Sequence, residues 1–194
     1  MGMISAALIV RDEEAFLPAC LQSLATAVDE IVIVDTGSTD RTPAIAAEFG
    51  AEVHFMPWRD DFSVARNKAI SLARGDWVFH IDADERLNVG HGPLLRQMAD
   101  KTEPGIMGLG VVCYSPVLDG TCEYPIRVYE STDAMVVHPL MRIHRRLPGI
   151  QYQNRCHEQF SPSVEVLGGR CVNTAISIWH VGYRESYIKA TDKL

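Results

Sequence analysis

Short apolar runs alternate with helical patterns along the first half of the chain. The run from Ile4 to Val10 carries no charged residue, which is typical of a strand buried on both faces of a parallel sheet. Apolar residues then recur at helical spacing before the next apolar run begins. The fold class expected from this order is α/β, a Rossmann-like three-layer α/β/α arrangement with a mostly parallel central sheet. The pattern predicts strands at 4–10, 30–35, 51–56 and 76–81, and helices near 16–24, 42–49 and 63–74.

The second half of the chain has a different, β-rich pattern. We expect mixed or antiparallel pairing here, in a strand order that the sequence pattern does not define. Residues 185–194 have the pattern of a helix that opens without a partner, so we expect either that the chain continues past Leu194 or that this helix docks on the domain. The pattern predicts a helix near 93–100 and strands at 106–114, 123–130, 136–144, 151–160 and 175–180.

Length and charge narrow the class of protein. A chain of 194 residues suits one domain, 1–194, with a well-buried core. The net charge of -7 and the pI near 5.4 argue against a general nucleic-acid binder, which needs a basic face. The basic cluster from Arg142 to Arg146 is expected at a solvated strand edge, with a local binding patch as the alternative.

The cysteines and the apolar segments indicate the cellular compartment in which the protein is expected. The five cysteines are odd in number and contain no C-x-x-C pair, which indicates reduced and mostly buried thiols. No signal peptide precedes the first apolar run, and that run is too short to span a bilayer. We therefore expect no transmembrane segment and a cytoplasmic protein, with a peripheral position at the inner face of the membrane as the alternative.

Acidic side chains follow several of the predicted strands. Ligands of open parallel sheets bind at the carboxyl ends of the strands, and here these ends lead into Arg11-Asp12-Glu13-Glu14, Asp35-Thr36-Gly37-Ser38 and Asp82-Ala83-Asp84-Glu85. Asp82 and Asp84 are two apart in an extended segment, so both can point to the same side. Such carboxylates repel each other unless a cation intervenes, and oxygen ligands suit Mg²⁺ or Mn²⁺, which also bind phosphates. A metal-bound diphosphate is the predicted ligand, and a solvated acidic turn is the alternative.

Several common motifs are absent from the sequence. There is no G-x-x-x-x-G-K-[ST] loop and no G-x-G-x-x-G after the first strand, which argues against P-loop enzymes and dinucleotide-dependent oxidoreductases. No H-E-x-x-H occurs, because His157-Glu158 continues as Gln159-Phe160-Ser161. No G-x-S-x-G elbow occurs either. The sequence therefore disfavours zinc proteases of this type and serine hydrolases.

Four ordered blocks carry a resemblance to a known family. They are Ile9 to Glu14, Asp29 to Thr42, Phe62 to Asn67 and Asp82 to Glu85, and they closely resemble family-2 glycosyltransferases of the GT-A fold. Arg155-Cys156-His157-Glu158 and Trp179-His180-Val181-Gly182-Tyr183 are similar to later motifs of one subgroup. The resemblance implies a nucleotide-sugar-binding half at 1–90 and an acceptor-side half at 91–194.

The resemblance also implies roles for individual residues. Asp35 corresponds to the acid that reads the base or ribose, although many relatives carry a second acid where this chain has Thr36. Asp82 and Asp84 correspond to the D-x-D pair, and His180 to a late histidine that completes the metal shell. The alternatives are a helix-capping role for Asp35, a solvated helix position for Arg66 and a structural role for His180. The predicted donor-binding residues are Arg11, Glu13, Asp35, Ser38, Arg66 and Asp82; the metal ligands are Asp82, Asp84 and His180; and the catalytic base is Glu158, with Glu85 as the second choice.

The implied reaction is the metal-dependent transfer of a sugar from a nucleotide-sugar donor, with a UDP-sugar expected, to a glycan, lipid or protein acceptor. The resemblance suggests inversion: one carboxylate activates the acceptor, and Mn²⁺ or Mg²⁺ stabilises the departing diphosphate. One rival is a sugar-1-phosphate nucleotidylyltransferase, which normally carries a glycine-rich basic loop where this chain has Arg11-Asp12-Glu13-Glu14. The other is a non-catalytic nucleotide-sugar-binding module.

Overall fold

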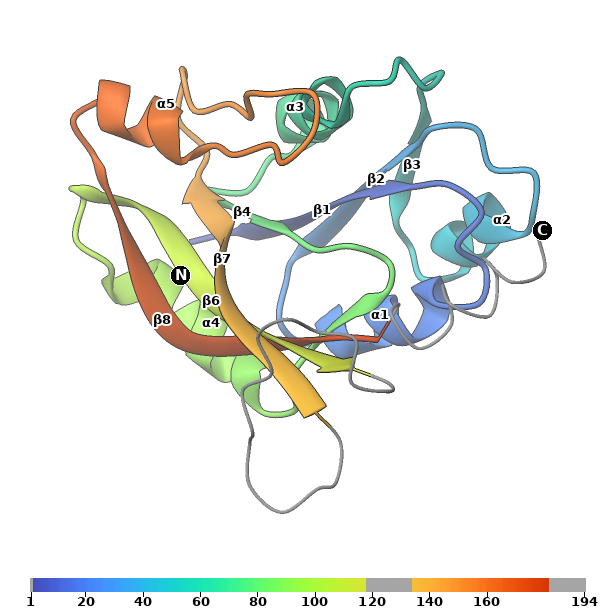
Figure 1. The fold of residues 1–194 in the computed structure, drawn as a ribbon, viewed down its shortest axis with the longest axis horizontal. Coiled ribbons are helices and arrows are strands. Elements are labelled where there is room, and N and C mark those ends of the chain that lie inside the picture. The colour runs from blue at the N-terminus through green and yellow to red at the C-terminus, as the bar shows by residue number, and fades with distance from the viewer. Residues whose placement is uncertain (1, 118–133, 182–194) are drawn as a thin grey trace.

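One mixed sheet organises the molecule. The structure is a computed structural model, and it describes residues 2–117 and 134–181. Within these residues eight strands form a single sheet in the order β3-β2-β1-β4-β7-β6-β8-β5 (Figure 1). The strands are β1 (Ile4–Val10), β2 (Glu30–Asp35), β3 (Glu52–Phe55), β4 (Trp77–His80), β5 (Glu85–Leu87), β6 (Ile106–Val117), β7 (Ala134–Arg145) and β8 (Arg170–His180).

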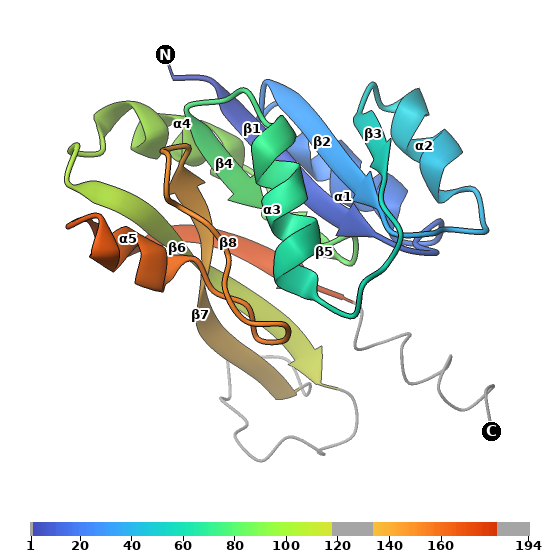
Figure 2. The ribbon, with the colours of Figure 1, turned by 90° about the horizontal axis from the view of Figure 1, so that it is seen from above.

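Helices cover both faces of this sheet. Helices α1, α2 and α4 pack on one face, and α3 and α5 lie on the other, as the view from above shows (Figure 2). This is the three-layer α/β/α arrangement that the alternating pattern predicts, so the predicted fold class is confirmed. The helices are α1 (Leu17–Leu24), α2 (Thr42–Glu48), α3 (Phe62–Leu72), α4 (His91–Lys101) and α5 (Ser161–Val166).

The parallel half of the sheet follows from local pattern. Strand β1 is buried along its whole length except at Ile9 and pairs in parallel with both β2 and β4. Helix α1 buries Leu17, Cys20, Leu21 and Leu24 against it, and Pro18 is tolerated because it lies in the first turn, where a backbone N–H has no helical partner. The carboxyl ends of β1, β2 and β4 therefore meet at one edge of the sheet, which is where the acidic segments were expected.

The second half of the sheet is mixed. Strand β7 runs antiparallel to both β4 and β6, whereas β8 runs parallel to β6 and antiparallel to β5. Helix α5 and the strand β5 were not predicted, and β8 begins five residues earlier than the strand expected at 175–180. Residue-level pattern did not define this half because its strands pair with partners far away in the sequence.

The strand predicted at 151–160 is wrong. This segment is a loop with a single isolated bridge between Gln153 and Gln159. Tyr152 and Phe160 are buried and anchor its two ends, while the polar residues between them cannot contribute to the core. Asn154 and His157 adopt positive φ values of 76° and 54°, which are incompatible with a regular strand. The strand predicted at 123–130 and the helix at 185–194 lie outside the described residues.

The prediction of buried thiols holds for only some cysteines. Cys20 and Cys113 are buried and free, whereas Cys171 is half-buried and Cys156 is exposed. Cys122 lies outside the described residues. Among the residues that are described, no helix is long and apolar enough to cross a membrane.

Candidate active site

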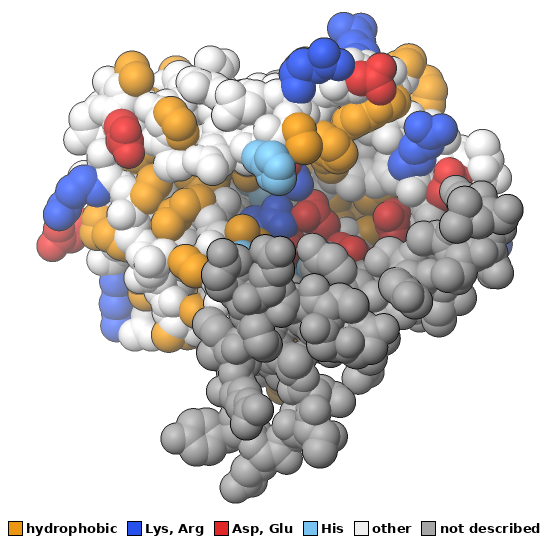
Figure 3. Space-filling view, viewed as in Figure 1, with side chains coloured by type: hydrophobic (Ala, Val, Ile, Leu, Met, Phe, Trp, Pro, Cys, Tyr) orange, Lys and Arg blue, Asp and Glu red, His pale blue; other side chains and the backbone are white. Residues whose placement is uncertain are grey.

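A pocket of about 670 Å³ opens at the carboxyl edge of the parallel strands. On this face, acidic, basic and histidine side chains gather around a hollow near the centre (Figure 3). Most of the predicted site residues line it, although they are up to 169 positions apart in the sequence. The described residues that line the pocket are Ile9, Val10, Arg11, Glu13, Thr36, Trp58, Phe62, Arg66, Asp82, Ala83, Asp84, Cys156, His157, Glu158 and His180.

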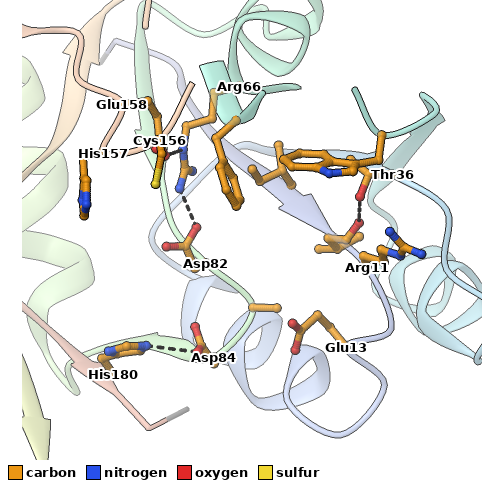
Figure 4. Close-up of a pocket in the computed structure, with 15 residues that line it drawn as sticks. Arg11, Glu13, Thr36, Arg66, Asp82, Asp84, Cys156, His157, Glu158 and His180 are labelled. Atoms are coloured by element: carbon orange, nitrogen blue, oxygen red, sulfur yellow. Dashed lines mark hydrogen bonds and ion pairs between the residues drawn. The ribbon is translucent and has the colours of Figure 1, made fainter. Parts of the chain in front are cut away.

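Arg66 connects the parallel half of the sheet to the loop that carries Glu158. Helix α3 begins at its N-cap Asp61, whose carboxylate accepts a hydrogen bond from the backbone N–H of Val64, and it presents Arg66 on its buried side. The guanidinium donates from Nη2 to Asp82 Oδ1 at 2.9 Å and from Nε to Glu158 Oε1 at 2.6 Å. Figure 4 shows Arg66 between these two carboxylates at the wall of the pocket. Arg66 is therefore a buried bridging residue rather than a solvated helix arginine.

Arg142 is the second arginine partner of Asp82, although the sequence pattern predicted a solvated edge for it. Its Nη2 donates to Asp82 Oδ2 at 2.8 Å and to Glu85 Oε1 at 2.5 Å. The pairing of β6 with β7 shifts register between Leu109 and Gly110, so that β7 carries one extra residue at Arg142. A bulge of this kind re-aims a side chain, and here it turns Arg142 inward to the carboxylates. The expectation of a solvated edge is wrong for this residue.

The pKa values of Asp82 and Glu85 are shifted in opposite directions. Burial by itself raises the pKa of Asp82, but Arg142 and Arg66 outweigh it and hold the pKa well below its usual value. Burial raises the pKa of Glu85 to about 7. The charge of Arg142 offsets only part of this effect of burial, and the negative charge of Asp82 raises the pKa of Glu85 further. Asp82 is therefore a fixed anion in the pocket wall, whereas Glu85 is a buried carboxyl behind it.

Asp84 and His180 form a pair on the opposite side of the pocket. Strands β5 and β8 are antiparallel, with Glu85 opposite His180, so the histidine ring lies beside the preceding Asp84. The distance from His180 Nε2 to Asp84 Oδ2 is 3.0 Å, and both side chains are about three-quarters buried (Figure 4). Burial lowers the pKa of His180, but the hydrogen bond and charge of Asp84 outweigh this and raise the pKa above its usual value. The sequence alone did not show that these two residues are neighbours.

The Asp84 and His180 pair fits a divalent cation as a partial ligand set. In this structure Asp84 Oδ2 and His180 Nε2 share a hydrogen bond of 3.0 Å, and the two atoms would be ligands of one ion only after Nε2 has lost its proton. Among the described residues, no three His, Cys, Asp or Glu side chains are grouped to hold an ion by themselves. Mg²⁺ in particular is commonly held by one or two carboxylates together with waters and substrate phosphates. Both oxygens of Asp82 accept from arginines, so its direct role as a metal ligand stays a prediction.

The turn after β2 lies next to the pocket, and only one of its residues, Thr36, lines it among those described. Asp35 is buried, and its Oδ1 accepts hydrogen bonds from the N–H groups of Gly37 and Ser38, which closes the turn after β2. The N-cap of α2 is Arg41, so the helix-capping alternative for Asp35 is wrong. Its Oδ2 has no hydrogen-bond partner among the described residues. Ser38 Oγ accepts from the N–H of Asp12 and so ties this turn to the loop after β1. Neither Asp35 nor Ser38 is among the lining residues; Thr36, which lies between them, is.

The two candidate bases have different surroundings. Glu158 lines the pocket, and its side chain retains 14% exposure beside Arg66. Glu85 is 2% exposed, is not among the lining residues, and accepts from the N–H of Asp82 and from Arg142. A base must reach the proton that it removes, so the geometry favours Glu158 and suits Glu85 to a positioning role.

Trp58 was not singled out from the sequence. It lines the pocket, and its ring meets that of Phe62 edge to face, with centroids 4.8 Å apart. The rule that ligands bind beyond the carboxyl ends of strands could have found it, because Trp58 follows the third strand just as Asp82 follows the fourth. No comparable sequence signal existed for Arg142, whose orientation depends on a bulge.

Comparison with known proteins identifies the family. The model of glycosyl transferase family 2 matches residues 5–142. The TPR repeat-containing protein Synpcc7942_0270 of Synechococcus elongatus is 37% identical over 190 residues, which cover 94% of this chain and 43% of that protein. The lipopolysaccharide core biosynthesis glycosyltransferase LpsC of Rhizobium meliloti is 40% identical over 100 residues, covering 49% of this chain and 36% of LpsC. The chain spans less than half the length of these relatives.

Solved structures agree on the fold. TarS of S. aureus superposes with a TM-score of 0.63 at 15% identity, covering 96% of this chain and 62% of the TarS chain. A mycobacterial protein gives a TM-score of 0.64 at 20% identity, covering 92% of this chain and 67% of the other. Because the family match covers most of the chain and the strand-end residues converge on one pocket, the chain belongs to glycosyl transferase family 2 and has the GT-A fold.

Proposed function

We propose that this chain transfers a sugar from a UDP-linked donor to an acceptor hydroxyl, with inversion and with a divalent cation. The observation that carries the proposal is the convergence of Arg66, Asp82, Asp84, Glu158 and His180 on one pocket at the carboxyl edge of the parallel strands. The fold relative TarS has been solved with UDP-GlcNAc, which supports a UDP-sugar as the donor class. The pocket volume of about 670 Å³ suits a ligand of that size.

The donor would lie between the turns after β1 and β2 and the Asp84 and His180 pair. Trp58 and Phe62 offer aromatic surface for the base, and Arg11 and Arg66 are among the basic residues of the described lining. Asp84 and His180 would hold Mn²⁺ or Mg²⁺. When bound, such a cation supplies Lewis-acid stabilisation of charge on diphosphate oxygens.

The chemical step is a single displacement at the anomeric carbon. Glu158 accepts the proton of the acceptor hydroxyl as the hydroxyl oxygen forms its bond to the anomeric carbon. The bond from that carbon to the diphosphate oxygen breaks, and the diphosphate leaves with the electron pair. Arg66 fixes Glu158 through Oε1, which leaves Oε2 for the acceptor proton. Attack from the side opposite the leaving group inverts the anomeric centre.

A thermal-shift series tests the donor and the metal together. We expect UDP with Mn²⁺ to raise the melting temperature more than UDP alone, and more than ADP, GDP or CDP with Mn²⁺. Asp84→Asn should remove the metal-dependent part of the shift, whereas Glu103→Gln, on an exposed side chain, should not. Equal shifts for all nucleotides, or a UDP shift indifferent to metal in the unaltered chain, would contradict the proposal.

Glu158→Gln tests the base. The amide can still accept from Arg66 but cannot take a proton, so UDP should bind normally while release of UDP from a UDP-sugar falls by about 10²-fold or more. Full turnover by this variant would dismiss Glu158 as the base. Binding of UDP with Mn²⁺ by the unaltered chain without turnover of a UDP-sugar would favour the non-catalytic binding module.

A further inference from the structure

A second cavity lies on the other side of the charged wall. Its volume is about 430 Å³, and it shares with the first pocket Arg66, Asp82, His157 and Glu158. The carboxylate of Glu158 therefore lies where the two cavities meet. The described residues that line the second cavity are Arg66, Asp82, Pro139, Leu140, Met141, Arg142, Tyr152, His157, Glu158, Gln159 and Ser161.

The charges in this wall are already paired. Arg66 binds Asp82 and Glu158, while Arg142 binds Asp82 and Glu85, at distances from 2.5 to 2.9 Å. A charged acceptor group would find no unpaired charge of opposite sign among these residues, and an ammonium group would have to displace an arginine from its carboxylate, which leaves a buried charge without its partner at a cost of several kcal/mol. A neutral hydroxyl can instead add hydrogen bonds to groups that stay paired.

Unused hydrogen-bond donors lie in the same wall. Arg142 Nε and Tyr152 Oη are buried and have no hydrogen-bond partner among the described residues, and the same holds for Arg66 Nη1. An unpaired buried donor costs about 1–3 kcal/mol. A ligand with several hydroxyl oxygens can satisfy such donors, and the carboxylate of Glu158 can accept from its hydroxyl groups.

Apolar side chains also line this cavity. Pro139 and Met141 of β7 lie two positions apart, next to the bulge that turns Arg142 inward, whereas Leu140 packs against the core on the other face of the sheet. Pro139 is exposed and Met141 is half-buried, so both are accessible to a ligand. A sugar ring combines these two needs, because it has apolar C–H faces and a rim of neutral hydroxyl groups.

We propose that the second cavity binds a neutral carbohydrate as the acceptor and presents one of its hydroxyl groups to Glu158. This inference rests on the proposed glycosyl transfer and specifies its acceptor class. The donor enters from the first pocket and the acceptor from the second, so the two substrates meet on opposite sides of the anomeric carbon. A single displacement requires that arrangement.

Ligand-observed saturation-transfer NMR tests this directly. The probes are methyl glycosides of glucose, galactose, mannose and N-acetylglucosamine, with glucose 6-phosphate, glucuronate and a serine-rich peptide as comparisons, all measured with UDP and Mn²⁺ present. We expect at least one neutral glycoside to bind and the charged sugars and the peptide not to bind. Binding of the peptide or a charged sugar alone, or of no neutral glycoside, would overturn the proposal.

Ser161→Trp fills the cavity from the start of α5 and should abolish glycoside binding. The UDP and Mn²⁺ thermal shift should persist, because Ser161 does not line the first pocket. The matched control is Ser71→Trp, on an exposed position of α3, which should bind glycosides as before. Gln159→Ala trims an exposed side chain of the cavity while its backbone bonds to Gln153 remain, and it should weaken binding even if Ser161→Trp does not fold.

The outcomes separate the two proposals. If the UDP shift is normal and glycoside binding is unaffected by both Ser161→Trp and Gln159→Ala, the cavity assignment is wrong and the proposed function stands. If UDP with Mn²⁺ gives no shift in the unaltered chain, the proposed function itself fails.

Discussion

Asp82 accepts from two arginines that reach it from separate parts of the chain, and this shapes the chemistry around it. Each oxygen is taken, Oδ1 by Arg66 and Oδ2 by Arg142. The acid was predicted from its place after a strand, but its partners lie 16 and 60 positions away. An alternating series of charges results, from Glu158 through Asp82 to Glu85.

This series predicts coupling between Arg142 and Glu85. Arg142→Met leaves the buried carboxylate of Glu85 and the one-third exposed carboxylate of Asp82 short of a partner and should lower the free energy of unfolding by up to about 3–5 kcal/mol. Adding Glu85→Gln removes one of those charges, so the double variant should lose less than the sum of the single variants. Urea denaturation of all four proteins measures the difference. Additivity within about 0.5 kcal/mol would show that the pair is not coupled.

Arg170→Met is the matched control for this cycle. Arg170 lies on β8 with 69% exposure, and its nearest carboxylate oxygen, on Glu103, is 3.9 Å away. Exposed pairs of this kind contribute about 0–1 kcal/mol. A loss as large as that of Arg142→Met would mean that the effect comes from removing an arginine in general rather than from burial.

At the scale of elements, the turn between α3 and β4 limits how close the helix and sheet can lie. A Cβ added at Gly75 would come within 2.7 Å of the Ser5 backbone nitrogen and 2.9 Å of the Met3 carbonyl oxygen. These are backbone atoms of β1 and of the residue before it, so neither can move independently. The close approach positions α3, and hence Arg66, over the parallel strands.

Gly75→Ala should therefore destabilise the fold. Overpacking of this kind costs about 1–3 kcal/mol, and the loss should appear as a lower urea midpoint with an unchanged slope. Gly105→Ala is the control, because a Cβ there meets nothing within 4 Å and its φ is not in the positive range. A Gly75→Ala protein as stable as the Gly105→Ala protein would contradict the close approach.

At the scale of the whole molecule, a histidine pair joins the two halves of the sheet. His80 of β4 and His144 of β7 are fully buried, with their Nε2 atoms 3.1 Å apart. His144 Nδ1 donates to the carbonyl of Arg145, so its Nε2 accepts and His80 Nε2 donates. The rings of Tyr152 and Phe160 pack against the pair. Both imidazoles are held neutral where the parallel and mixed halves meet.

This pair predicts that stability falls in mild acid. Burial lowers the pKa of His144 to about 4, whereas an unfolded histidine titrates near 6.5. Between these values the unfolded chain binds more protons than the folded chain, so the free energy of unfolding falls as the pH falls from about 6.5 to 4, by about 3 kcal/mol for one such residue. Urea denaturation at several pH values between about 6.5 and 4 measures this change in the free energy of unfolding.

Substitution of His144 tests whether this residue causes the dependence of the free energy of unfolding on pH. His144→Phe keeps an aromatic ring beside Phe160 but cannot titrate, so its stability should depend less on pH. His54→Gln, at a half-exposed position of β3, should keep the slope of the unaltered chain. An unchanged slope in His144→Phe would assign the pH dependence to other groups.

Local pattern was sufficient for the parallel half of the fold. The strands ending near Val10, Asp35 and Ile81, the helices between them and the acids after them follow from apolar spacing and turn residues, which act over a few positions. The sheet edge then brings Arg11, Glu13, Asp82 and Asp84 together. Local pattern was therefore enough to predict the fold class and the acidic residues at the edge of the sheet.

The partners of these acids depend on contacts between segments that are distant in the sequence. Arg142 reaches Asp82 through a bulge, Glu158 lies on a loop where a strand was predicted, and His180 meets Asp84 through the pairing of β5 with β8. Each depends on contacts between segments 60 to 96 positions apart. Periodicity reports which face of an element is buried, but not which distant element covers that face.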